Sequence, residues 1–135
     1  MSMVIGGYVI TSDGSRDQLE PVVCPNDDNV RKALNRVASS RGIVDLRHRS
    51  APDEGPHKLV LYVDDGVLQP MLNEYGRDGE RQPRTLDSVE SEKGLVTLLG
   101  EKHPASATTA DLVPVCNLFL EFFRTGDVSK RVMTY

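Results

Sequence analysis

The side chains best suited to chemistry are few and scattered. The three histidines, His48, His57 and His103, lie in separate segments, and none has the i, i+4 partner of a helical metal site. The HExxH, GxSxG, P-loop and EF-hand patterns are absent. His48 and His57 can meet across a hairpin, but a metal site needs a third ligand and an outer shell of hydrogen bonds. The sequence therefore predicts no catalytic residue, no metal site and no cofactor.

The two cysteines indicate a reducing compartment. Cys24 precedes Pro25 in an expected loop, and Cys116 lies in an apolar segment, where it reads as a small core side chain. They form no CxxC pair, so nothing favours a disulfide framework, a zinc ribbon or a redox site. The first eight residues have no basic leader, and every apolar run is far shorter than the ~20 residues of a membrane span. We expect a cytoplasmic protein without membrane contact.

Carboxylates and glycines each offer one further possibility. The adjacent Asp64 and Asp65 resemble an acid–base pair, but neighbouring strand residues point to opposite faces, and Asp before Gly66 is ordinary turn chemistry. The pair Gly6-Gly7 is too short to cradle a phosphate, so we expect a strand bulge or a close approach of two backbones there.

Length and charge narrow the class of protein. The 135 residues predict a single domain, 1–135, large enough to bury a core without disulfides or metal. With 16 Lys and Arg against 20 Asp and Glu, the net charge of -4 argues against sequence-independent nucleic-acid binding and favours a basic partner. The same charge is also ordinary for a soluble bacterial protein.

The elements that must position these residues follow from periodicity and turn signals. Strands are expected at 3–11, 43–49, 57–64, 67–75 and 80–87, with a short extended piece at 19–23. Asp65-Gly66 predicts a tight hairpin turn, and the segment 76–79 predicts a second one. Pro70 cannot donate to a ladder, so its strand should lie at an edge or be bulged. The glycine-bounded run 94–100 fits either a strand or a helical turn.

Two helices complete the prediction. The first begins at caps within 25–28, runs to about Ser39 and has Gly42 as its stop signal. The second begins at Thr108 or Asp111, ends at Gly126 and should be the principal core helix. Its residues at helical spacing are Leu112, Val115, Cys116, Phe119, Phe122 and Phe123. The order of elements predicts an α+β fold, with a single antiparallel meander sheet and two main helices packed on it.

The remaining candidate is a surface at the tips of the meander. Carboxylates and a tyrosine gather in the loops, where acids can steer a basic protein and an aromatic ring can anchor it. The alternative is a set of solvated turns. The candidate partner-binding residues are Asp53, Glu54, Asp64, Asp65, Tyr75, Asp78 and Glu80.

Two stretches carry a resemblance. The opening Ile5-Gly-Gly-Tyr-Val-Ile-Thr, followed by Arg16-Asp-Gln-Leu-Glu-Pro-Val-Val, resembles a family of small uncharacterised bacterial proteins, as does the closing Phe119-Leu-Glu-Phe-Phe-Arg-Thr-Gly-Asp-Val-Ser129. The helix ending in Phe-Phe-x-Thr-Gly before an extended tail is also similar to the close of immunity proteins from bacterial polymorphic toxin systems. This resemblance implies a non-enzymatic protein that neutralises a cognate toxin by direct contact.

We therefore expect an immunity protein whose partner is a toxin domain. A second hypothesis is an adaptor or assembly module with a secretion or regulatory partner. A third is a small enzyme with a dispersed site, which would gather His48 or His57 with a carboxylate in a concave pocket. The sequence leaves the oligomeric state open.

Overall fold

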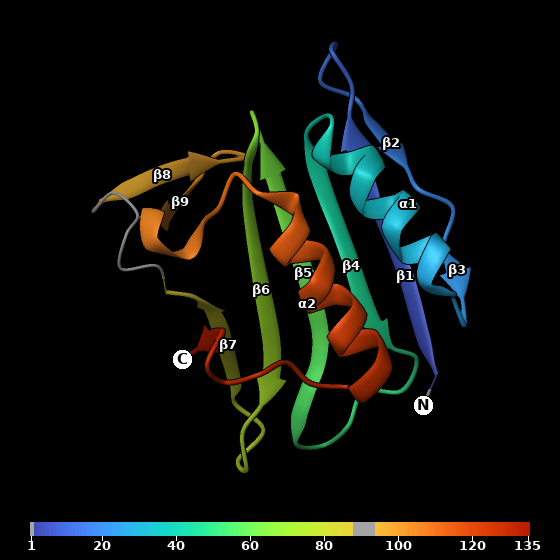
Figure 1. Ribbon diagram of the computed structural model, residues 1–135, viewed down its shortest axis with the longest axis vertical. Helices are drawn as coiled ribbons and strands as arrows, with labels where there is room; N and C mark the ends of the chain where they lie inside the picture. Colours follow the sequence, from blue (N-terminus) through green and yellow to red (C-terminus); the bar gives the residue numbers. More distant parts are fainter. Residues whose placement is uncertain (1, 88–93) are drawn as a thin grey trace.

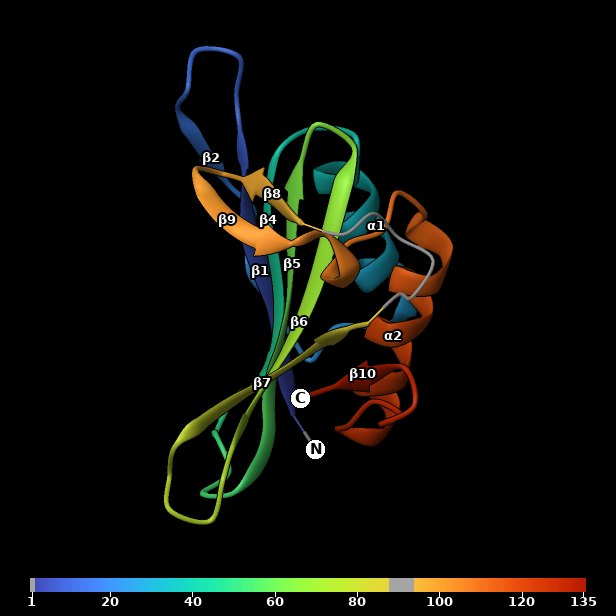
Figure 2. The ribbon, with the colours of Figure 1, turned by 90° about the vertical axis from the view of Figure 1, so that its left-hand side faces the viewer.

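The fold is one large sheet with two helices on one face and a small hairpin on the other (Figures 1 and 2). It is seen in a computed structural model that describes residues 2–87 and 94–135. Along the sheet the strands follow the order β10-β7-β6-β5-β4-β1-β2, with β3 also paired to β1, and every neighbouring pair is antiparallel. This arrangement confirms the predicted α+β fold with its meander and two helices.

The described elements are these. The strands are β1 (Met3–Ile10), β2 (Arg16–Gln18), β3 (Val22–Val23), β4 (Gly42–His48), β5 (Gly55–Asp64), β6 (Val67–Tyr75), β7 (Arg81–Leu86), β8 (Leu95–Leu98), β9 (Glu101–Pro104) and β10 (Met133–Thr134). The helices are α1 (Asp27–Ala38) and α2 (Leu112–Thr125), with a 3₁₀ turn η1 (Ala105–Ala107). Of the strands, β2, β9 and the short β10 lie outside the segments expected from periodicity.

Helix α1 forms where its caps predict. Asn26 accepts a hydrogen bond from the backbone N–H of Asn29, and the Asn29 side chain accepts one from the backbone N–H of Asn26, which makes a capping box. One face buries Val30, Leu34 and Val37 against the sheet. The helix ends at its cap Ser39, as predicted, but Gly42 is not part of the helix end and instead begins β4.

Helix α2 is the core helix that its apolar spacing predicts. Asp111 caps the first turn, and Gly126 ends the helix in the left-handed conformation with φ 79°. Phe119 and Phe122 are fully buried, and Cys116 packs at the edge of the same cluster. The core therefore lies between the two helices and the face of the main sheet that they cover.

The central hairpin follows its sequence signal, whereas the expectation for Pro70 needs correction. Strand β6 is neither an edge strand nor bulged at Pro70, because β5 pairs with it on one side and β7 on the other. Pairing with β7 stops at Met71, however, and the N–H of Leu68 donates to the Thr109 carbonyl instead. Leu68 and Pro70 present their backbone nitrogens to the same side of β6. Pro70, which has no N–H to donate, therefore lies in the short gap between the Thr109 contact of Leu68 and the start of pairing with β7 at Met71.

The run 94–100 contains a strand. Strand β8 pairs with β9 in a two-stranded sheet of its own, and Figure 2 shows this hairpin on the side of the main sheet opposite the helices. Tyr62 of β5 and His103 of β9 bring their rings to 5.8 Å, and Leu98 is buried beneath the hairpin. The hairpin covers part of a sheet face that would otherwise be open to solvent.

Candidate functional site: a groove at the C-terminal tail

The predicted partner-binding residues lie at two opposite ends of the sheet. Asp64 and Asp65 are at the β5–β6 turn, at the top of Figure 1, whereas the β4–β5 and β6–β7 loops with the other five lie at the bottom. Ten strand residues separate these ends, which corresponds to roughly 30 Å at about 3.3 Å per residue. The seven residues therefore do not form one compact surface.

Asp64 is occupied by the fold itself. One carboxylate oxygen accepts a hydrogen bond from Arg41 Nε at 2.8 Å, and the other accepts one from the backbone N–H of Leu99 at 2.9 Å. The side chain thereby ties the β8–β9 hairpin to the main sheet. Its neighbour Asp65 is exposed and adopts the left-handed conformation, with φ 48°, of the tight turn.

We expect Asp64→Ala to lower the free energy of unfolding by about 1–2 kcal/mol, since it removes the acceptor for two donors. Asp65→Asn keeps a residue that tolerates positive φ, so it should change stability by less than about 0.5 kcal/mol. Urea unfolding of both variants measures the difference. Equal stabilities would show that Asp64 does not hold the hairpin.

The opposite end contains a groove of about 540 Å³, called here the C-terminal groove. It lies between the loops of the meander and the tail that follows α2. Its lining residues are Glu54, Gly55, Pro56, Glu74, Tyr75, Gly76, Arg77, Asp78, Gln82, Asp127, Lys130 and Tyr135. The structure thus brings together three of the predicted residues, Glu54, Tyr75 and Asp78. Asp53 and Glu80 are exposed nearby in sequence but do not line the groove.

A buried arginine holds the groove together. Arg84 of β7 is fully buried, and its guanidinium donates to the backbone carbonyls of Val128 at 2.7 Å and Met133 at 3.1 Å. The same group contacts the carboxylates of Asp127 at 2.9 Å and Glu74 at 3.4 Å. It thereby joins strands β6 and β7 to the tail segment 127–133 and fixes two of the groove's carboxylates. This set of contacts is called here the Arg84 clamp.

Two tyrosines form part of the groove wall. The Tyr135 hydroxyl donates a hydrogen bond to Glu74, and this bond raises the pKa of Tyr135 above its ordinary value. The Tyr75 ring stacks on His57 with centroids 4.1 Å apart and an angle of 14° between the planes. Burial lowers the pKa of His57, which favours the neutral imidazole beneath Tyr75.

The two histidines considered for a dispersed enzyme site each pack against an aromatic ring. The His48 ring packs edge-on against Phe122 at 5.7 Å, and His57 faces Tyr75. Neither lines the C-terminal groove. Among residues 2–87 and 94–135, no group of three or more His, Cys, Asp or Glu side chains is placed to hold a metal ion.

Sequence reasoning missed Glu74, the buried Arg84 and the tail residues that complete the groove. Glu74 and Arg84 occupy ordinary positions within β6 and β7, and nothing in the strand pattern marks them as an ion pair. Asp127 directly follows Gly126 at the end of the second helix, and nothing in the sequence links it to the meander. The one available signal was an arginine within a short strand, and that pattern does not say which partners surround it.

Comparisons with known proteins identify a family and a fold. None of the curated proteins is significantly similar to the chain. A solved structure described as a hypothetical protein from Neisseria gonorrhoeae superposes with a TM-score of 0.83 at 20% sequence identity, covering 95% of this chain and 90% of that one. At that identity the similarity shows the fold alone. In the described segments, no helix is long and apolar enough to cross a membrane.

The family is shown by a sequence match over nearly the whole chain. Residues 2–132 match the family described as "Family of unknown function (DUF6911)". The matched range includes α1, α2, the meander and Arg84 with all of its hydrogen-bond partners except Met133. The chain therefore belongs to this family of unknown function, DUF6911.

Proposed function

We propose that this protein is an immunity protein that binds a cognate toxin domain directly, with the C-terminal groove as its contact surface. The observation that carries the proposal is the groove's combination of carboxylates and tyrosines on a fixed frame. Acidic side chains increase the rate at which a basic partner associates, and tyrosines are common energetic anchors in interfaces. The resemblance of the α2 ending to immunity proteins supports the same function.

The charges of the groove favour a basic partner. Four carboxylates line it, against the cations Arg77 and Lys130. The buried Arg84 guanidinium balances the charges of Glu74 and Asp127, whereas the carboxylates of Glu54 and Asp78 are exposed to solvent. Glu54 is 62% exposed and lies 3.9 Å from Arg77, a contact too long and too exposed to neutralise it effectively.

The function is tested by co-expressing the protein with the product of its neighbouring gene. Growth rescue together with a stable purified complex is the expected result. A complex without toxicity would instead favour an adaptor or assembly module. The absence of both toxicity and a complex would contradict the immunity function for that gene pair.

The groove is tested by one charge reversal with a matched control. We expect Glu54→Lys to slow association with the co-purified partner by about tenfold at low salt, with a smaller effect at high salt. Glu101→Lys makes the same change of charge on the exposed surface of β9, away from the groove, and should leave the rate within about twofold. Stopped-flow measurements at two salt concentrations give both rates. Equal effects of the two variants would exclude the groove as the steering surface.

A further inference from the structure

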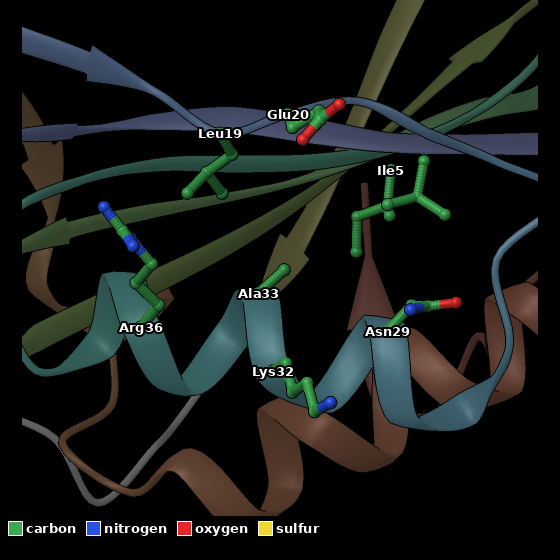
Figure 3. Close-up of a pocket in the computed structure, with 9 residues that line it drawn as sticks. Ile5, Leu19, Glu20, Asn29, Lys32, Ala33 and Arg36 are labelled. Atoms are coloured by element: carbon green, nitrogen blue, oxygen red, sulfur yellow. The ribbon is translucent and has the colours of Figure 1, made fainter.

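A second cavity lies at the other edge of the sheet, between α1, strand β1 and the segment joining β2 to β3. Its volume is about 240 Å³, and it is called here the α1 pocket. Its lining residues are Ile5, Gly6, Leu19, Glu20, Val22, Asn29, Lys32, Ala33 and Arg36. Figure 3 shows Ile5 and Leu19 reaching from the strand side toward Ala33 of the helix.

The middle of the α1 pocket is apolar and its ends are polar. Ile5, Leu19 and Ala33 lie around its centre, whereas Arg36 lies at one end beside Leu19 and Asn29 lies at the other (Figure 3). An engineered apolar cavity of about 150 Å³ in another protein holds benzene, so about 240 Å³ has room for one ring with a short substituent or a chain of roughly six to eight carbons. The walls therefore suit a small apolar group that enters between helix and sheet.

Two cations, Lys32 and Arg36, line the pocket. Figure 3 shows the Lys32 amine directed away from Ile5 and Leu19, so the cation that such a ligand would meet is Arg36. Its guanidinium has five N–H donors, and one nitrogen, Nη2, contacts Asp17 at 3.0 Å. The remaining donors can bind an incoming carboxylate, which forms stronger hydrogen bonds with a guanidinium than a neutral oxygen does. Glu20 lies on the opposite wall, so an anionic head group is favoured at the Arg36 end and disfavoured at the Glu20 wall.

We propose that the α1 pocket binds a small amphipathic carboxylate, with its apolar part between Ile5, Leu19 and Ala33 and its carboxylate at Arg36. This site is independent of the toxin-binding function, because the C-terminal groove is built from β5, β6, β7 and the tail at the far side of the sheet. Failure of either proposal leaves the other intact.

The test uses three probes of eight carbons each, with an anionic, a neutral and a cationic head group. The full chain, labelled with ¹⁵N, is titrated with octanoate, octan-1-ol and octylamine, and the amide shifts of Gly6, Leu19 and Ala33 are followed. We expect saturable binding of octanoate, about fivefold tighter than octan-1-ol, with octylamine weakest. No saturable shift with octanoate, or a preference for octylamine, would overturn the proposal.

Three variants separate the head-group contact from the apolar contact. Arg36→Gln should reduce octanoate affinity to that of octan-1-ol, and Asp17→Asn should raise it because the competing carboxylate is gone. Ala33→Leu should weaken both ligands by filling the pocket, with its melting temperature checked against that of the unsubstituted protein. Because Arg36 and Asp17 are exposed, their variants should remain folded, and unchanged affinities in both would contradict the assigned carboxylate position.

Discussion

Replacing Arg84 with methionine is expected to lower the free energy of unfolding by about 3–5 kcal/mol, because it breaks a buried ionic network from one side. The substitution leaves the Glu74 carboxylate, only 7% exposed as a residue, without its buried cation. It also removes the donors to the carbonyls of Val128 and Met133. Unsatisfied buried charges and acceptors cost far more than a lost surface contact.

Urea unfolding measures this effect, and two further variants make the comparison specific. Arg124→Met removes an ion pair with Asp27 in which the arginine is 56% exposed, and it should cost no more than about 1 kcal/mol. The double variant Arg84→Met with Glu74→Gln should recover part of the loss, because it removes the buried charge left behind. Equal costs for Arg84→Met and Arg124→Met would contradict the clamp.

The second large effect is expected at Gly7. Its φ of 142° is one that side chains rarely adopt, and a Cβ there would lie 2.0 Å from the carbonyl oxygen of Ile43 on β4. Gly42 shows the reciprocal arrangement, with a Cβ placed 2.1 Å from the Tyr8 carbonyl oxygen. We expect Gly7→Ala to cost about 3 kcal/mol or more, since the β1 and β4 backbones must separate.

The neighbouring glycine provides the control. A Cβ at Gly6 would meet only the tip of Arg47 at 4.0 Å, so Gly6→Ala should leave stability unchanged or raise it by up to about 1 kcal/mol. Thermal and urea unfolding of both variants check the difference. If Gly6→Ala and Gly7→Ala behaved alike, the close approach of the two backbones would not be a determinant of stability.

Local signals predicted most of the fold because each acts within a few residues. The caps at Asn26, Asp111 and Gly126 and the turn at Asp65-Gly66 all form where the sequence places them. The Gly6-Gly7 pair left a bulge and a close approach as alternatives. The structure shows the second, since β1 pairs with β4 residue by residue from Met3 to Val9.

Features that depend on distant pairing were not predictable in the same way. The β8–β9 hairpin begins within the glycine-bounded run 94–100, whose periodicity fits either a strand or a helical turn. Its place on the sheet face opposite the helices depends on contacts with Asp64 and Tyr62. The candidate surface was only partly predicted for the same reason. Residue type suggested carboxylates in loops. Strand direction and length place Asp64 and Asp65 at one end of the sheet and Glu54 and Asp78 at the other.

The Arg84 clamp makes occupancy of the C-terminal groove and docking of the tail thermodynamically linked. Asp127, Lys130 and Tyr135 contribute to the groove only while segment 127–135 lies against β7. A partner that binds the assembled groove therefore stabilises the docked tail. By reciprocity, a change that loosens the tail weakens the binding of the partner through the same coupling free energy. Residues such as Val128, which do not line the groove, can thus set the affinity measured there.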